Sequence, residues 1–222
     1  MAAPLLVFDL DGTLADTAGD LVATLNHILA REGLAPLALE TARNMVGMGA
    51  RSLINQGFLA SGRTLDPDRL EALFSDYLAW YEAHIAVHTR LFPGVTAALD
   101  RFESAGWRFA VCTNKAQGPS LKLLDALGVA GRFAAICGQD TFAWSKPDAR
   151  ALLSTIDRAG GAPNASIMVG DSRTDIATAK NARVPVVAVD FGYTDTPVSQ
   201  LDPDRVISHF DALWDAVGQL RA

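Results

Sequence analysis

Two aspartates, Asp9 and Asp11, stand two residues apart directly after the apolar run Leu5–Phe8. Gly12 follows them and permits a tight turn, and Thr13 adds a hydroxyl and an N–H group. A buried strand that ends in this way places both carboxylates at its carboxyl end, where open α/β sheets bind ligands. Two carboxylates at such a point repel each other unless a cation or a shared proton intervenes. The pattern indicates metal-assisted chemistry, with one carboxylate as nucleophile and the other as acid/base.

Three further polar clusters stand where strands of the same sheet should end. They are Thr113-Asn114-Lys115, Lys146-Pro147 and Gly170-Asp171-Ser172-Arg173-Thr174-Asp175. Because the carboxyl ends of parallel strands lie at one edge of a sheet, we expect these clusters to converge on the two aspartates. Thr113 and the N–H of Asn114 can donate to phosphate oxygens, and Lys146 offers a point charge for a phosphoryl group or a carboxylate.

The last of these clusters supplies further carboxylates for a metal ion. Asp171 can complete an oxygen-rich Mg²⁺ site with Asp9. Asp175 lies four residues later, in the first turn of the next predicted helix, where it can support the metal shell or bind a metal water. The sequence therefore predicts Mg²⁺ as the cofactor.

The elements that must position these residues alternate between apolar runs and helical patterns, which predicts a doubly wound α/β fold with a parallel sheet. We expect strands at residues 5–8, 107–113, 133–137, 166–169 and 186–189, with a weaker last strand at 205–208. We expect helices at about 94–105, 117–127, 149–159, 174–182 and 211–220.

A long segment between the first two strands contains no convincing strand and shows helical apolar faces instead. It predicts a small helical cap domain, residues 16–88, inserted into a core domain of residues 1–15 and 89–222. The two segments that connect this cap to the core both lie beside the predicted site, an arrangement that suits a lid that opens and closes.

The four motifs together resemble those of haloacid-dehalogenase-superfamily phosphatases over essentially the full chain. The matching residues are Asp9-Leu10-Asp11-Gly12-Thr13, Thr113-Asn114, Lys146 and Gly170-Asp171-Ser172-x-x-Asp175. The resemblance implies a Rossmann-like core and an aspartyl-phosphate intermediate on the nucleophile, Asp9. It implies that Asp11 is the general acid/base and a metal ligand through its main-chain carbonyl. Asp171 would be the third protein ligand, and Thr113 and Lys146 would complete the catalytic set.

The insertion resembles the cap of the phosphoglycolate-phosphatase-like branch of that superfamily, most closely at residues 45–51. This resemblance implies 2-phosphoglycolate as the substrate. N–H groups around Gly47, before the helix predicted from residue 52, can hold a small anion. Arg51 is a candidate clamp for the substrate carboxylate. The expected substrate-binding residues are Thr13, Gly47, Arg51, Asn114 and Lys115.

Other functions share parts of this pattern. A phosphatase of another small sugar or acid phosphate, and a hexose-phosphate mutase of the same superfamily, keep all the catalytic residues. A haloacid dehalogenase needs no metal and typically lacks the second motif aspartate, so Asp11 argues against it. A receiver-type signalling domain has its phosphorylated aspartate after a later strand and no helical insertion, so the motif order argues against it as well.

Composition limits the partners. The 222 residues carry a net charge of −6 with no basic run, which argues against nucleic acid and membrane surfaces. The start lacks a basic segment, and Asp9 interrupts its apolar stretch, so we expect no signal peptide. Cys112 and Cys137 lie in apolar stretches and are expected to be reduced thiols of a cytoplasmic protein. We expect a monomer or homodimer that binds a small phosphate ester.

Overall fold

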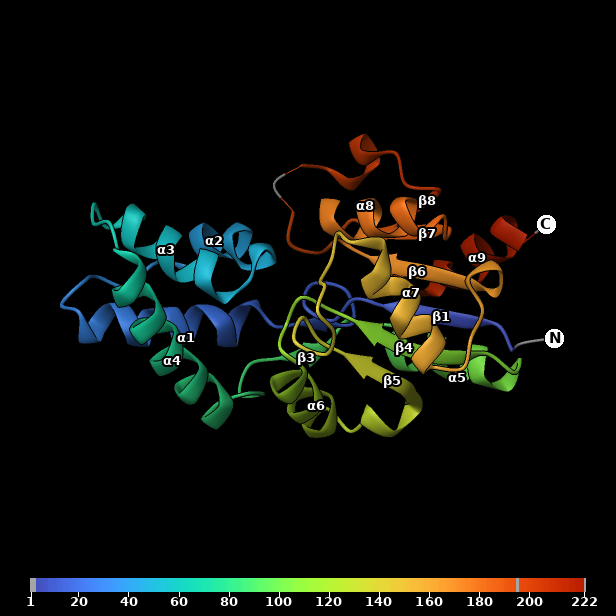
Figure 1. Ribbon diagram of the computed structural model, residues 1–222, viewed down its shortest axis with the longest axis horizontal. Coiled ribbons are helices and arrows are strands. Elements are labelled where there is room, and N and C mark those ends of the chain that lie inside the picture. The colour runs from blue at the N-terminus through green and yellow to red at the C-terminus, as the bar shows by residue number, and fades with distance from the viewer. Residues whose placement is uncertain (1–2, 195, 222) are drawn as a thin grey trace. The chain divides into compact units, whose positions relative to one another are not determined.

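The computed structural model describes residues 3–194 and 196–221. The chain divides into two compact units, Met1–Asp16 with Leu91–Ala222, and Thr17–Arg90. We call them the core unit and the helical unit (Figure 1). Among the described residues, no helix is both long enough and apolar enough to cross a bilayer.

The core unit is built on a six-stranded parallel sheet with the strand order β5-β4-β1-β6-β7-β8. The strands are β1 (Leu5–Phe8), β4 (Arg108–Cys112), β5 (Phe133–Cys137), β6 (Ser166–Gly170), β7 (Val186–Val189) and β8 (Arg205–Ile207). The order places β1 in the middle, with Phe8 paired to Val111 of β4 and to Val169 of β6. The chain fills one side of β1 first and then the other, so the carboxyl end of β1 is a switch point of the sheet. The predicted α/β fold is confirmed.

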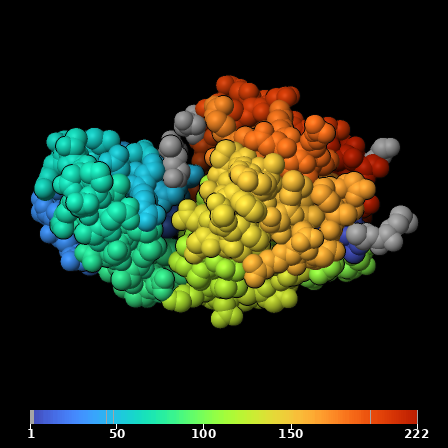
Figure 2. Space-filling view, viewed as in Figure 1, coloured from blue at the N-terminus to red at the C-terminus, as the bar shows by residue number. Residues whose placement is uncertain are grey.

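Helices cover both faces of this sheet. They are α5 (Val95–Ser104), α6 (Gln117–Ala126), α7 (Ala149–Arg158), α8 (Arg173–Ala182) and α9 (Leu213–Arg221). On one face, α7 contacts β1, β4 and β5, and α8 contacts β6 and β7. α5 and α9 pack against each other, and α9 contacts β7 and β8 (Figure 1). In the space-filling view, the yellow and light-orange residues in and around α7 form much of the core-unit surface that faces the viewer (Figure 2).

The central strands are buried on both faces, which explains why they read as continuous apolar runs. Leu5 and Val7 belong to a buried cluster that includes Leu152 and Ile156 of α7. The alternate residue Phe8 contacts the ring of Phe109 edge-on, with 6.0 Å between the ring centroids. Alternation along β1 therefore holds the strand between two apolar layers and fixes where its carboxyl end emerges.

The helical unit contains α1 (Ala18–Arg31), α2 (Leu39–Ala42), α3 (Ala50–Ala60) and α4 (Pro67–Ala83). Residues 43–48 form a 3₁₀ helix between α2 and α3. No strand occurs within residues 17–89, all of which the structure describes. The N-cap Asp66 accepts a hydrogen bond from Arg69 N, and Pro67 occupies the first position of α4. The Tyr77 hydroxyl donates to Leu21 O at 3.1 Å, which ties α4 to α1.

Two very short strands, β2 (Ala15–Asp16) and β3 (Arg90–Leu91), pair where the chain passes between the two units. Just inside the helical unit, the buried carboxylate of Asp20 accepts hydrogen bonds from the backbone N–H of His88 and Thr89, both at 2.9 Å. It also accepts one from the Thr89 hydroxyl at 2.7 Å. The two ends of the helical unit are therefore fastened to each other.

Candidate active site

The end of β1 is held in place by its neighbour β6. Asp9 N donates to Val169 O at 2.9 Å, which extends the strand pairing by one residue. Gly12 then turns the chain with a φ of 84°, a conformation that favours glycine. A Cβ atom at Gly12 would lie only 2.4 Å from Asp171 Oδ2, so the absence of a side chain lets the turn approach that carboxylate.

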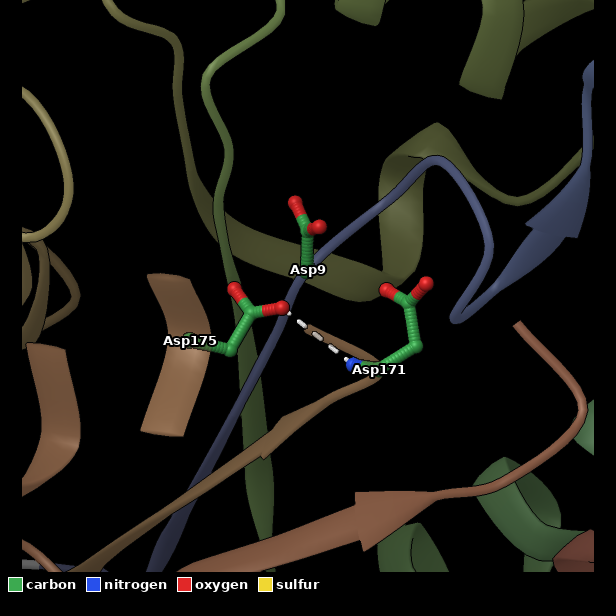
Figure 3. Close-up of side chains that lie close together, drawn as sticks. All are labelled: Asp9, Asp171 and Asp175. Carbon is green, nitrogen blue, oxygen red and sulfur yellow. Dashed lines mark hydrogen bonds between the residues drawn. The ribbon is translucent and has the colours of Figure 1, made fainter. Parts of the chain in front are cut away.

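The end of β6 and the start of α8 form the second part of the site. Ser172 and Asp175 make a capping box, in which the Asp175 Oδ2 atom accepts from Ser172 N at 3.0 Å and Ser172 Oγ at 2.6 Å. The same oxygen accepts from Asp171 N at 3.2 Å (Figure 3). Helix capping thus turns Asp175, which is fully buried, toward Asp9 and Asp171.

Lys146 joins the two parts electrostatically. Its Nζ lies 2.5 Å from Asp175 Oδ1 and 2.9 Å from Asp9 Oδ1, and its side chain is only 3% exposed. Asn114 fixes the backbone of Lys146, because its side-chain amide donates to Lys146 O at 3.0 Å and accepts from Lys146 N at 3.1 Å. The side chain of Asn114 therefore positions Lys146, which leaves the Asn114 N–H as the group expected to bind phosphate.

Asp171 is held by two donors. Thr13 Oγ1 donates to its Oδ1 at 2.9 Å, and Tyr193 N donates to its Oδ2 at 2.7 Å. The hydroxyl of Thr13 is therefore directed at Asp171, while its expected contact with substrate stays a prediction. The sequence interpretation did not include Tyr193, whose hydroxyl also donates to Asp16 Oδ1 at 2.5 Å. The signal was available, because Asp190-Phe191-Gly192-Tyr193 follows a buried strand at the same sheet edge.

Burial dominates the protonation of the carboxylates. It raises the pKa of Asp9 to about 6, with Lys146 opposing the rise and Asp175 adding to it. Burial also raises the pKa of Asp171 well above its usual range, and the nearby charges of Asp175 and Asp9 act in the same direction. Burial works against the charge on Lys146, but Asp175 and Asp9 more than offset it, so the pKa of Lys146 lies above its ordinary value.

The carboxylates fit a divalent cation. One oxygen each from Asp9, Asp171 and Asp175 lies within 4.8 Å of the others. Asp9 Oδ1 is buried and accepts no well-directed hydrogen bond, although the Lys146 ammonium is 2.9 Å away. Three buried carboxylates around one ammonium leave excess negative charge, and carboxylate oxygens are the ligands that Mg²⁺ prefers. Asp175 uses both of its oxygens on donors within the protein, which distinguishes it from Asp9.

Asp11 and Thr113 lie at the same edge of the sheet. Thr113 is 4% exposed, and its N–H donates to Cys137 O at 3.0 Å. The ammonium of Lys115 contacts both carboxylate oxygens of Asp11, at 3.1 and 3.2 Å. The core unit thus brings together the residues expected from all four motifs.

The two candidates in the helical unit have their own surroundings there. Gly47 is exposed in the 3₁₀ helix of residues 43–48. Arg51 makes a bidentate ion pair with Glu71, Nε to Oε1 at 2.7 Å and Nη2 to Oε2 at 2.9 Å. Its guanidinium carbon also lies 3.6 Å from the ring centroid of Phe74. The roles of Gly47 and Arg51 toward a substrate stay predictions.

Comparisons with known proteins agree with this geometry. The family model for haloacid dehalogenase-like hydrolases matches residues 6–189. A curated phosphoglycolate phosphatase of Mesorhizobium japonicum is 52% identical over 216 residues, covering 96% of this chain and 94% of that protein. One from Agrobacterium fabrum is 46% identical over 97% of this chain and 92% of its own length. A crystal structure described as a predicted phosphoglycolate phosphatase from Haemophilus somnus has a TM-score of 0.89 at 26% identity, covering 97% of this chain and 98% of that one.

Proposed function

Because the chain belongs to the haloacid dehalogenase-like hydrolases, we propose that it hydrolyses 2-phosphoglycolate to glycolate and phosphate through a phosphorylated Asp9. It is an enzyme of the phosphoric monoester hydrolase class. The observation that carries the mechanism is the placement of Lys146 between Asp9 and Asp175 at the carboxyl end of β1. A buried carboxylate beside a fixed ammonium is a suitable acceptor for a phosphoryl group, whose negative charge the ammonium offsets.

The proposed cycle has two half-reactions. A carboxylate oxygen of Asp9 attacks phosphorus, the bond from phosphorus to the glycolate oxygen breaks, and Asp11 gives that oxygen a proton. Water then attacks the phosphorus of the aspartyl phosphate while Asp11 takes a proton from it, and the bond to the Asp9 oxygen breaks to release phosphate. Asp11 thus returns to its starting state, acting as acid and then as base. Thr113 and the N–H of Asn114 bind the phosphoryl oxygens.

A magnesium ion is the proposed cofactor, and Asp9, Asp171 and the main-chain carbonyl of Asp11 would hold it. When bound, it neutralises charge on the phosphoryl oxygens. Asp175 supports this site by fixing Lys146 and the Asp171 backbone. The three buried carboxylates, whose oxygens lie within 4.8 Å of one another around the single ammonium of Lys146, support the assignment.

The substrate proposal depends on the names of the relatives together with the positions in the helical unit expected to bind an anion. Relatives at 52% and 46% identity carry the name phosphoglycolate phosphatase. Arg51 offers a guanidinium, the group that best matches a carboxylate. The guanidinium would recognise the carboxylate of phosphoglycolate, which lies at the opposite end of the molecule from the phosphate.

The proposal is tested by measuring phosphate release from 2-phosphoglycolate by the wild type and by Asp9→Asn, each with Mg²⁺ and with EDTA. Asp9→Asn should lose on the order of 10⁴-fold or more in turnover, because an amide is a poor nucleophile for phosphorus. Wild-type activity should vanish in EDTA and return when Mg²⁺ is added in excess.

Matched substrates separate the parts of this proposal. Hexose phosphates and p-nitrophenyl phosphate are assayed beside phosphoglycolate, which should have the highest kcat/KM. A preference for hexose phosphates would remove the substrate assignment and leave the mechanism standing. An Asp9→Asn variant that keeps a tenth of the wild-type turnover would overturn the covalent mechanism, as full activity in EDTA would overturn the cofactor.

A further inference from the structure

Two lysines of the core unit contact the two aspartates of the β1 turn. Lys146 Nζ lies 2.9 Å from Asp9 Oδ1, and Lys115 Nζ lies 3.1 and 3.2 Å from the two carboxylate oxygens of Asp11. The Lys146 contact belongs to the phosphoryl site described above. Lys115 takes no direct part in the proposed cycle. Its contact with Asp11 also differs from the contact with substrate that was expected from the sequence.

The burial of this second pair sets it apart from a surface ion pair. The side chain of Lys115 is 7% exposed and that of Asp11 is 20% exposed. By comparison, Lys180 and Asp202 of the same unit form a pair whose side chains are 43% and 94% exposed. A lysine side chain has a flexible stem and a strongly hydrated ammonium group. The surrounding structure must therefore hold the Lys115 side chain if it is to stay buried against the carboxylate.

The backbone of Lys115 shows how it is held. Lys115 N donates to Thr113 Oγ1 at 3.2 Å, and Gln139 N donates to Lys115 O at 3.1 Å. A Cβ atom at Gly138 would lie 2.5 Å from Lys115 O, so the loop after β5 packs directly on this backbone. The two loops after β4 and β5 together fix the point from which the Lys115 stem reaches Asp11.

This geometry constrains Asp11 in a way that matters for proton transfer. Both carboxylate oxygens face the same ammonium, which holds the side chain in one orientation while part of it remains open to solvent. A general acid or base works only within hydrogen-bond reach of the atom it serves, and small misplacements lower the rate strongly.

We propose that Lys115 is a positioning residue for Asp11, acting on the reaction through that carboxylate and not through the substrate. The proposal rests on the proposed function, in which Asp11 protonates the leaving group. Lys146 then serves the nucleophile and Lys115 serves the acid/base, with one buried ammonium for each carboxylate of the turn.

The test is a double-mutant cycle with Lys115→Met and Asp11→Asn, together with Lys115→Arg. For 2-phosphoglycolate, Lys115→Met should lower kcat by about 10-fold or more with little change in KM, because its alkoxide leaving group needs a well-placed proton donor. The first-turnover release of p-nitrophenolate should fall less than about 3-fold, because this leaving group needs little protonation. Lys115→Arg should restore most of the lost rate on phosphoglycolate.

In the Asp11→Asn background, adding Lys115→Met should change the rate by less than about 2-fold, measured as phosphate release at high enzyme concentration. Three results would each overturn the proposal. Lys115→Met could lower the rate as strongly in the Asp11→Asn background as in the wild type, or it could lower the rates on both substrates equally. It could also raise KM and leave kcat unchanged. Lys180→Met is the matched control, because it removes a lysine from the exposed ion pair with Asp202, and it should leave all rates unchanged. The Asp9→Asn assay decides the phosphatase mechanism separately, so a missing coupling between Lys115 and Asp11 would remove the positioning role alone.

Discussion

At the residue scale, the site gathers charges that the fold alone would not require. Asp9, Asp171 and Asp175 are 8%, 2% and 0% exposed, and Lys146 is the ammonium that contacts two of them. A buried carboxylate is costly unless it is paired, and mutual repulsion adds to that cost. Burial accordingly raises the pKa values of Asp9 and Asp171. Clusters with such shifted groups in one cleft are typical of catalytic sites.

The raised pKa of Asp9 predicts how the metal-free protein responds to pH. Its carboxyl has a pKa of about 6 in the folded protein, against about 3.9 for an aspartate in an unfolded chain. Between these values the folded state binds more protons, so stability falls as pH rises, and the full penalty is present above about pH 6. In EDTA, Asp9→Asn should therefore raise the melting temperature at pH 8, and the gain should shrink toward pH 4.

Asp148 offers a control of opposite sign. Its exposed carboxylate pairs with Arg150, and that hydrogen bonding lowers its pKa to about 2. The ionised form is favoured in the folded state, so Asp148→Asn should lower stability slightly at pH 8 and not raise it. Both melting temperatures come from the same scans in EDTA. A stabilisation by Asp9→Asn that is largest at pH 4 would contradict the assigned cause.

At the scale of elements, the sheet was predictable because its central strands are buried on both faces and therefore form continuous apolar runs. Phe133–Cys137 and Val186–Val189 appear in the structure with the expected bounds, and the weak last strand appears at Arg205–Ile207. The two-residue strands β2 and β3 were not predicted, because two residues show no alternation. The contacts of Lys115 with Asp11 and of Tyr193 with Asp171 depend on loops that meet only in the folded chain.

Asp20, in the first turn of α1, was also not anticipated, and it joins residues that are far apart in the sequence. Its carboxylate accepts from His88 N, Thr89 N and Thr89 Oγ1. Asp20→Ala leaves these donors without their acceptor, which should lower the free energy of unfolding by on the order of 2 kcal/mol. The measurements are urea unfolding and amide hydrogen exchange, which should speed up at His88 and Thr89.

Asp68→Ala is the matched control, because Asp68 also lies in the first turn of a helix but is exposed. It should change the free energy of unfolding by less than about 0.5 kcal/mol. Asp20→Ala could instead change the free energy of unfolding as little as Asp68→Ala does and leave amide exchange at Thr89 unchanged. The hydrogen bonds of Asp20 would then contribute nothing to stability.

At the scale of the whole molecule, the proposed function assigns catalysis and substrate discrimination to different parts of the chain. The residues assigned to phosphoryl transfer all belong to the core unit, Met1–Asp16 with Leu91–Ala222. In the proposed cycle they contact only the phosphoryl group and the leaving-group oxygen, and every phosphate monoester has both of these. We therefore predict that discrimination between monoesters comes mainly from the inserted helical unit, in which the sequence indicates Arg51 as the residue for a carboxylate.

Arg51→Ala tests this division of roles. Loss of a charge-assisted contact to the substrate carboxylate should lower kcat/KM on 2-phosphoglycolate by about 30-fold, or about 2 kcal/mol. The loss should be small on p-nitrophenyl phosphate, which has no carboxylate. Steady-state rates on both substrates make the comparison.

The ion pair of Arg51 with Glu71 provides a control that the sequence did not suggest. In the structure the guanidinium already binds one carboxylate in bidentate fashion and lies over Phe74. Glu71→Gln weakens that pair but keeps Arg51, so it should preserve or raise kcat/KM on phosphoglycolate if Arg51 serves the substrate. If the pair instead serves the helical unit, Arg51→Ala and Glu71→Gln should lower stability together and reduce activity on both substrates equally. Because the pair is exposed, its own contribution to stability should be small, so the two variants should differ chiefly in their activity on phosphoglycolate.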